Sequence, residues 1–248
     1  YGLRNLSSSY DGNVVEVRRS SDDTTQNFTA AEITNGTLLA FVGTGGSDNG
    51  FVKTWYDQSG NSKNAAQATA AKQPKIVSAG ALVTSGGLPA IDNYLSNSGI
   101  ILETGLTGLQ NTNYSHFAVS NTASTQGTGM LLGQSVSSPF VGAIQDGSSS
   151  TAQASVVTNI PSYYKNGALL VAPNRDALHT AFHSSEIVLS SIELLTTSDT
   201  LWLNDFEILT YRSDATTFSA KTLVSEWIIY ASDQSDKRRA IEESIAGH

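Results

Sequence analysis

The residues with the clearest chemical potential lie in one short segment, Thr54 to Asn61, which reads Thr-Trp-Tyr-Asp-Gln-Ser-Gly-Asn. Strand-forming residues lead directly into a polar turn that carries a carboxylate, two amides and a hydroxyl. Sugar recognition usually combines these two elements, because an aromatic ring stacks on the sugar and polar groups bond its hydroxyls. A local role is the alternative, since Asp57, Ser59 and Asn61 can each bond their own backbone in Asx-type turns.

Aromatic and polar residues elsewhere in the chain extend this set. The candidate ligand-binding residues are Trp55, Asp57, Asn61, Tyr94, Tyr163 and Trp202. Trp202 lies between a polar loop, residues 196–200, and Asp205, which favours a position near the surface. Burial is the competing interpretation for the aromatic residues, and we expect Trp55 or Tyr56 to face the core because they are neighbours on a strand.

Composition limits the partners that this chain can bind. The 248 residues carry 14 Lys and Arg against 22 Asp and Glu, a formal net charge of −8. This balance argues against nucleic acid and against an anionic membrane surface. No cysteine is present, so disulfides and thiolate metal sites are excluded. No apolar run is long enough for membrane insertion, no signal peptide is visible, and the start at Tyr1 predicts a processed product or a fragment.

Other catalytic and metal-binding patterns are weaker. His179 and His183 would share a face on a helix, but residues 177–188 favour a strand. His116 lies on an apolar strand, where a buried structural role is expected. No nucleophile elbow, Walker loop or dinucleotide fingerprint occurs. We therefore predict no cofactor, with an oxygen-ligated Ca²⁺ ion as the open alternative. Residues near turns that could hold Ca²⁺ are Asp48, Asn49, Asp57, Asp92 and Asn93.

Short apolar runs separated by polar, glycine-bearing breaks predict an all-β fold, an antiparallel β-sandwich. Examples of these runs are 14–17, 38–42 and 117–119. The clearest hairpin is 163–170, because Asn-Gly at its centre suits a type I′ turn. With no repeat and no linker, we expect residues 1–248 to form a single domain.

Only the end of the chain reads as a helix. Ser232 or Asp233 can cap it, and Gly247 can end it. Its apolar face would consist of Ala240, Ile241 and Ile245. Residues 218–230 suit either a second short helix or a strand.

Several segments carry a resemblance to known families. Residues 1–10, 17–23, 55–64, 73–76 and 228–235, in this order, resemble concanavalin/laminin-G-like modules of phage tail and virion proteins. A smaller set is similar to the catalytic β-sandwich of family 54 α-L-arabinofuranosidases. This second set comprises Arg19, Ser21, Asp22 and Asp23, the turn from Tyr56 to Asn61, and Tyr211, Ser213 and Asp214. Both resemblances imply a concanavalin/laminin-G-like jelly roll, here with a short C-terminal helix.

The second resemblance also implies a test for catalysis. A retaining glycosidase needs two carboxyl groups roughly 5 Å apart. In the arabinofuranosidases the nucleophile is a Glu after a Gly-rich, Met-containing strand, and the comparable residues 127–134 contain no carboxylate. A vicinal cysteine pair of those enzymes is also missing. The nearest candidate for the general acid is Glu193, in an apolar, strand-like setting. The resemblance therefore predicts a non-catalytic relative.

The leading hypothesis from the sequence is a non-catalytic carbohydrate-binding or host-surface adhesion module, at a virion surface or otherwise extracellular. Its partners would be host-surface glycans, other virion proteins, or both, with self-association as a further alternative. A structural capsid-decoration or fibre domain is the second hypothesis. A glycoside hydrolase of arabinofuranosidase type is the third.

Overall fold

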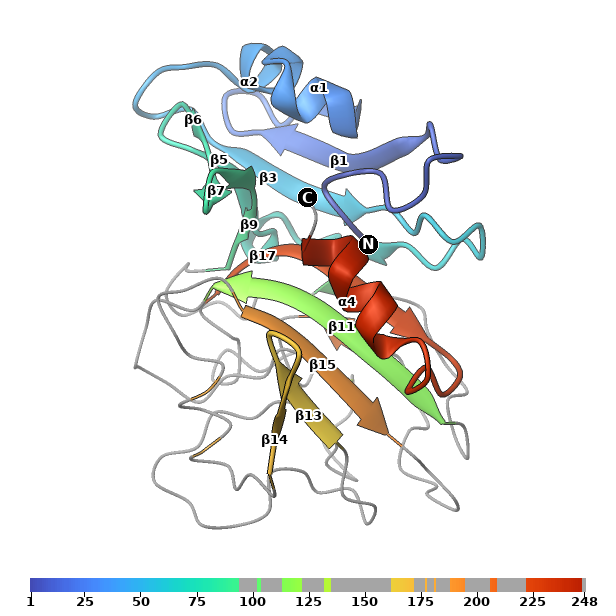
Figure 1. Cartoon of the computed structure of the whole chain (residues 1–248). Coiled ribbons are helices and arrows are strands. Elements are labelled where there is room, and N and C mark those ends of the chain that lie inside the picture. Colours follow the sequence, from blue (N-terminus) through green and yellow to red (C-terminus); the bar gives the residue numbers. More distant parts are fainter. Residues whose placement is uncertain are drawn as a thin grey trace.

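Figure 1 shows the computed structural model of the whole chain. The structure describes residues 1–93, 102–103, 113–121, 132–134, 162–171, 177, 181, 188–194, 206–208 and 222–246. Within these residues the fold is mostly β, and every strand pair is antiparallel.

The strands of the first half are β1 (Asn13–Arg19), β2 (Thr25–Thr29), β3 (Gly50–Trp55), β4 (Ala65–Ala66), β5 (Lys75–Ser78), β6 (Ala81–Leu82), β7 (Thr84–Ser85), β8 (Leu88–Pro89) and β9 (Ile91–Asp92). Those of the second half are β10 (Leu102–Glu103), β11 (Tyr114–Asn121), β12 (Leu132–Gln134), β13 (Ser162–Lys165), β14 (Ala168–Leu170), β15 (Val188–Leu194), β16 (Phe206–Ile208) and β17 (Leu223–Tyr230). The helices are α1 (Ala30–Thr34), α2 (Thr37–Val42), the 3₁₀ turn η1 (Ala70–Lys72) and α4 (Arg238–Ala246).

One large sheet contains nearly all of these strands. Its order is β12-β16-β10-β4-β3-β5-β9-β17-β11-β15-β13-β14, with β1 and β2 attached beside β3 and β6 beside β5. The β7–β8 pair forms a small separate ribbon. In Figure 1 the β1–β3 region lies above the β17-β11-β15-β13 region, and the N-terminus lies where the two meet.

Two hydrophobic clusters follow from the alternation of side chains along the central strands. On β11, Ala118 belongs to the main core, together with the fully buried Trp55 and Trp227. The neighbouring residue Phe117 points to the opposite face, where it packs with Leu189 and with Ile245 of α4. The helix therefore covers the outer face of the sheet near β11 (Figure 1).

The helices α1 and α2 differ from the sequence expectation that only the chain end is helical. Residues 38–42 were expected to form a strand but lie in α2, because Leu38 and Val42, four residues apart, share one buried helical face. Helix α1 starts at a capping box, in which the Thr29 hydroxyl accepts from the Glu32 N–H and Glu32 accepts from the Thr29 N–H.

The antiparallel β-sandwich class with a short C-terminal helix is confirmed, while the jelly-roll connectivity stays a prediction. The 163–170 hairpin forms as β13 and β14, with positive φ at Asn166 (49°) and Gly167 (82°). Residues 223–230 form strand β17, which settles the alternative between helix and strand. Asp233 caps the turn before α4 by accepting the Ser235 N–H at 2.9 Å. In the described part of the chain, no helix is long and apolar enough to cross a membrane.

Candidate functional site

Two of the predicted aromatic binding residues are buried in the core. Trp55 is 0% exposed and Tyr163 is 1% exposed. The Trp55 ring packs against the Tyr1 ring, with centroids 5.8 Å apart. Neither ring has a face open to solvent on which a sugar could stack, so the prediction for these two residues is corrected. Tyr94 and Trp202 lie outside the described residues.

Asp57 organises the turn that follows β3. Its Oδ1 accepts the Ser59 N–H at 2.8 Å, and its Oδ2 accepts the Lys63 N–H at 3.0 Å. The Asn61 side-chain amide donates to the Ser59 hydroxyl at 2.9 Å. Gly60 has φ of 85°, a left-handed conformation that glycine adopts without strain. The Asx-type turn that the sequence permits is therefore present, and it fixes Asp57 and Asn61 at the end of β3.

The carboxyl group of Asp57 is held in its ionised form. Burial acts to raise its pKa, but hydrogen bonds from the side chain and N–H of Ser59 and from the N–H of Lys63 outweigh burial, so the pKa is lowered. A carboxylate held in this way is a good hydrogen-bond acceptor near neutral pH. It is a poor proton donor, which argues against a role as general acid.

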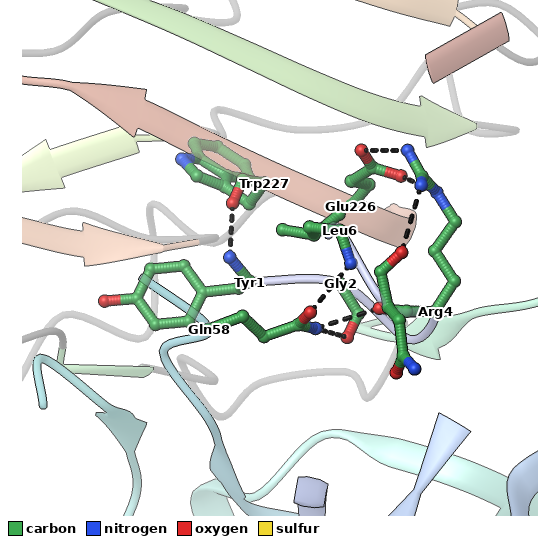
Figure 2. A network of polar contacts seen from close by, with 8 residues as sticks. Tyr1, Gly2, Arg4, Leu6, Gln58, Glu226 and Trp227 are labelled. Carbon is green, nitrogen blue, oxygen red and sulfur yellow. Dashed lines mark hydrogen bonds and ion pairs between the residues drawn. The ribbon is translucent and has the colours of Figure 1, made fainter. Parts of the chain in front are cut away.

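Gln58 fastens the N-terminal segment to the same turn (Figure 2). Its amide nitrogen donates to the carbonyl oxygens of Gly2 and Arg4, both at 2.9 Å, and its amide oxygen accepts the Leu6 N–H at 2.8 Å. The Tyr1 nitrogen donates to the Trp227 carbonyl at 2.7 Å, which places the segment along the edge of β17. Three of the segments that carry the family resemblance, 1–10, 55–64 and 228–235, therefore meet in space.

A bidentate ion pair closes the other side of this network (Figure 2). Arg4 Nε and Nη2 donate to Glu226 Oε2 and Oε1, both at 2.8 Å. The Glu226 side chain is 6% exposed and that of Arg4 is 26% exposed. Two parallel charge-assisted bonds of this kind orient both partners, so the pair serves to hold the N-terminal segment. Sequence reasoning missed it because its partners lie at opposite ends of the chain.

A cavity of about 410 Å³ lies between the Asp57 turn, the N-terminal segment and the end of β17. Among the predicted binding residues, Asp57 and Asn61 both line it. Lys63 and Tyr230 add an ammonium and a phenol, while Leu6 adds apolar surface. We call this space the turn cavity.

The Arg-rich segment 17–23 has a structural role. Arg19 forms a bidentate pair with Asp22 at 2.8 and 2.6 Å, and Arg18 pairs with Asp23. The Arg19 guanidinium holds the pKa of the Asp22 carboxyl well below its usual range. The two arginines point to opposite faces, with Arg18 over Phe51 and Arg19 over Phe41.

Backbone register brings two glutamates to facing positions. Glu103 in β10 lies directly opposite Glu207 in β16, and Glu207 lies opposite Gly133 in β12. Directly opposed positions of an antiparallel pair lie on the same face of the sheet, so the register makes two acidic positions neighbours. This juxtaposition is a candidate functional pair. Sequence reasoning missed it because only the strand register brings these two positions together.

The same register row continues into the first half of the sheet. Glu103 lies opposite Ala66 in β4, Ala66 opposite Thr54 in β3, and Thr54 opposite Glu16 in β1. Opposed residues share a face, and the Thr54 hydroxyl indeed donates to Glu16 at 3.0 Å. The predicted acid Glu193 lies elsewhere. In β15 it faces Ser115 and Ser162, so no second carboxylate stands directly opposite it.

The predicted metal ligands do not form a cluster in the described part of the chain, where no group of three or more histidine and acidic residues could hold an ion. Asp48 instead accepts the Gly45 N–H at 2.8 Å. His116 is fully buried against the Trp227 ring, with centroids 4.5 Å apart, and its pKa is lowered to about 3 by burial. His179 and His183 lie outside the described residues. Calcium binding stays an untested prediction.

No protein-family model and no curated protein sequence matches the chain. Three solved structures do. An arabinofuranosidase complexed with arabinofuranosyl-α-1,2-xylobiose aligns with a TM-score of 0.59 and 15% identity over 99% of this chain. A glutamate-to-glutamine mutant of a family 54 α-L-arabinofuranosidase, soaked with 4-nitrophenyl α-L-arabinofuranoside, aligns with a TM-score of 0.59 and 14% identity over 98%. A family 54 enzyme soaked with a cyclic sulfate inhibitor aligns with a TM-score of 0.58 and 16% identity over 98%.

The chain has the fold of these arabinofuranosidases. It spans 60–61% of the length of the matched chains. At this level of identity the comparison establishes the fold, and the activity of the whole relatives does not transfer with it.

Two sequence predictions are overturned by these matches. The phage or virion adhesion module is wrong as the leading hypothesis, because all three matched structures are arabinofuranosidases and none is a phage or virion module. The prediction of a non-catalytic relative is wrong for the same reason. It rested on the missing carboxylate in residues 127–134, the missing cysteine pair and the apolar setting of Glu193.

Proposed function

We propose that this chain is a glycoside hydrolase domain of the arabinofuranosidase type, which releases arabinofuranosyl groups from a larger glycan. The observation that carries this proposal is the likeness of almost the whole chain to three arabinofuranosidase structures. The acidic composition agrees with a neutral rather than an anionic substrate, because a net charge of −8 repels polyanions.

The reaction needs two carboxyl groups, one to protonate the leaving oxygen and one to act as nucleophile or base. Glu103 and Glu207 are our candidates for this pair. The strand register places them at directly opposed positions of two neighbouring strands. Residues 127–134 are the stretch comparable with the strand that carries the nucleophile in the family. Strand β12 forms the end of this stretch and lies beside β16.

The absence of cysteine does not oppose this chemistry. In the arabinofuranosidases that this chain resembles, the cysteine pair faces the sugar. Cleavage of the glycosidic bond depends instead on the two carboxyl groups. Loss of the pair changes how the sugar is held and leaves the proton transfers possible. Asp57 is excluded from the pair because its carboxylate is tied to the backbone of its own turn.

The test is hydrolysis of 4-nitrophenyl α-L-arabinofuranoside and of arabinofuranosyl-xylobiose by the wild type and by Glu103→Gln and Glu207→Gln. We expect release of arabinose by the wild type and a loss of kcat of about 10²–10⁴-fold in each variant. Glu243→Gln is the matched control, because this glutamate lies on the exposed face of α4 with a side chain 67% exposed.

Two results would contradict the proposal at different levels. If the folded wild type cleaves neither substrate, the proposed hydrolase function is wrong. If cleavage persists in both variants, Glu103 and Glu207 are not the catalytic pair. If cleavage is lost only in Glu193→Gln, Glu193 is the general acid.

A further inference from the structure

We propose that the turn cavity is an outlying carbohydrate subsite, which binds one backbone unit of a neutral pentose-based oligosaccharide. The choice of a pentose ligand rests on the proposed hydrolase function, while the carbohydrate class follows from the cavity lining. The cavity of about 410 Å³ is within the usual range for small-ligand sites.

The polar wall offers hydrogen-bonding groups that the protein does not use. The Lys63 ammonium, the Asn61 side-chain oxygen and the Tyr230 hydroxyl have no hydrogen-bond partner among the described residues. Asp57 accepts bonds from its own turn, but a carboxylate has about four acceptor positions, so capacity remains. The lining therefore offers both donors and acceptors, and the hydroxyl groups of a sugar can bond to either.

The opposite wall is apolar. Leu6 and Ile229 line it. Sugar rings present C–H faces that pack on such surfaces while their hydroxyl edges bond polar groups. Asp57 and Lys63 are the charged side chains of the described lining, and their charges of −1 and +1 sum to zero. A neutral polyol fits this balance better than a phosphate or a metal ion.

The polar wall is rigid before any ligand arrives. Asp57 fixes the turn through two backbone N–H groups, and Gln58 ties the turn to the N-terminal segment with three hydrogen bonds (Figure 2). Preorganisation of this kind lowers the entropy that binding must overcome. The segment Thr54–Asn61 contains both buried residues and exposed polar residues. The buried residues hold the exposed ones in position to bind a ligand.

The position suits an outlying subsite. Thr54 shares a register row with Glu103, two strands away, and Asp57 follows Thr54 by three residues. With about 4.8 Å between strands and about 3.3 Å per residue, the cavity lies within roughly 20 Å of the proposed catalytic pair. A substrate of a few sugar units can span this distance.

The larger cavities near α4 do not offer the same chemistry. One of about 810 Å³ has Arg238 paired with Glu242 and Arg239 paired with Glu243 in its wall. Its remaining lining is mostly apolar, including Val119 and Leu189. The charged groups there already have partners, so they contribute little to recognition of a polar ligand.

Binding of xylotetraose, measured by isothermal titration calorimetry, tests the subsite directly. This ligand carries no arabinofuranosyl group, so the proposed hydrolase does not consume it during the measurement. The test variant is Asn61→Ala/Lys63→Ala, in which both side chains are exposed and the substitutions remove one hydrogen bond within the turn, from Asn61 to Ser59. Lys237→Ala is the matched control, because Lys237 is an exposed lysine outside the cavity.

We expect saturable binding by the wild type and by the control, weakened about tenfold or more in the double variant, since two ligand hydrogen bonds are lost. Equal affinity of the double variant and the wild type, or no binding by the wild type, would overturn the subsite. Hydrolysis is measured separately. Binding that depends on Lys63 without any hydrolysis would refute the proposed function and support the subsite, whereas hydrolysis with unchanged binding would do the reverse.

Discussion

Acidification should destabilise this fold through His116. The side chain is fully buried, and neither ring nitrogen has a hydrogen-bond partner among the residues that the structure describes. Burial lowers its pKa from 6.5 to about 3, because no charged or polar group compensates the imidazolium for the loss of water. In the unfolded chain the same histidine titrates near its ordinary pKa.

The sign and size follow from proton linkage. Above pH 6.5 His116 is neutral in both states and contributes no pH dependence. Below pH 6.5 the unfolded state binds the proton and the folded state does not, so the free energy of unfolding falls by up to about 1.4 kcal/mol per pH unit. Between pH 6.5 and 4.5 the loss is therefore roughly 2–3 kcal/mol. Asp57 and Glu16 are carboxylates with a lowered pKa, and they stabilise the folded state while they are ionised. This stabilisation is lost only as the pH approaches their ordinary pKa, so they affect the free energy of unfolding mainly below the range from pH 6.5 to 4.5.

Urea denaturation at pH 7.5, 6.5, 5.5 and 4.5, followed by tryptophan fluorescence, measures this effect. Trp227 packs directly on His116, so its emission reports on the site. We expect the midpoint to fall with pH in the wild type and to fall much less in His116→Phe. An NMR titration of the wild type gives an independent check if the variant fails to fold. A midpoint that is flat from pH 6.5 to 4.5, or a His116 signal that titrates near pH 6, would refute the reasoning.

Two further predictions concern stability. Arg4→Ala should cost about 1.5–3 kcal/mol in urea unfolding, because it removes two charge-assisted hydrogen bonds from the buried Glu226 carboxylate, whereas Arg239→Ala, which breaks an exposed helical pair, should cost less than about 0.5 kcal/mol. Similar losses in both variants would contradict the role of the buried pair. Gly80→Ala should lower the thermal midpoint more than Gly36→Ala. Both glycines have positive φ, but a Cβ at Gly80 would lie 2.4 Å from backbone atoms, while a Cβ at Gly36 meets nothing within 4 Å. Equal shifts would show that the close approach at Gly80 relaxes.

The sequence predicted those elements whose signal is local. The Asn166-Gly167 turn is encoded by neighbouring residues and is present. The C-terminal helix is also present, with Ile241 and Ile245 packed on the sheet, but Ala240 of the predicted apolar face is exposed and Glu242 is buried instead. Residues 38–42 were mispredicted because a short apolar run has no decisive period, and its helical state depends on burial of Leu38 and Val42 against the core.

The candidate site depended on information that local patterns do not carry. Trp55 was a candidate because an aromatic ring can stack on a sugar, but its side chain lies in the core, which the sequence predicted for either Trp55 or Tyr56. Glu103 and Glu207 come together through the register of two short strands, which no sequence window contains. Asp57 and Asn61 were found because the turn itself is local, while the cavity beside them needs β17 and the N-terminal segment.

The geometry of the proposed catalytic pair depends on a narrow part of the sheet. Glu103 is linked to β4 by a single register pair, at Ala66, and β4 is linked to β3 by two. Strand β3 is in turn paired over most of its length with β1 and packed on the main core. Among the described residues, these few register pairs connect the facing glutamates to the well-packed half of the fold, which also holds the turn cavity. A long substrate that bound at both places would add contacts between them, which is a physical reason for the proposed hydrolase to hold its substrate at an outlying subsite.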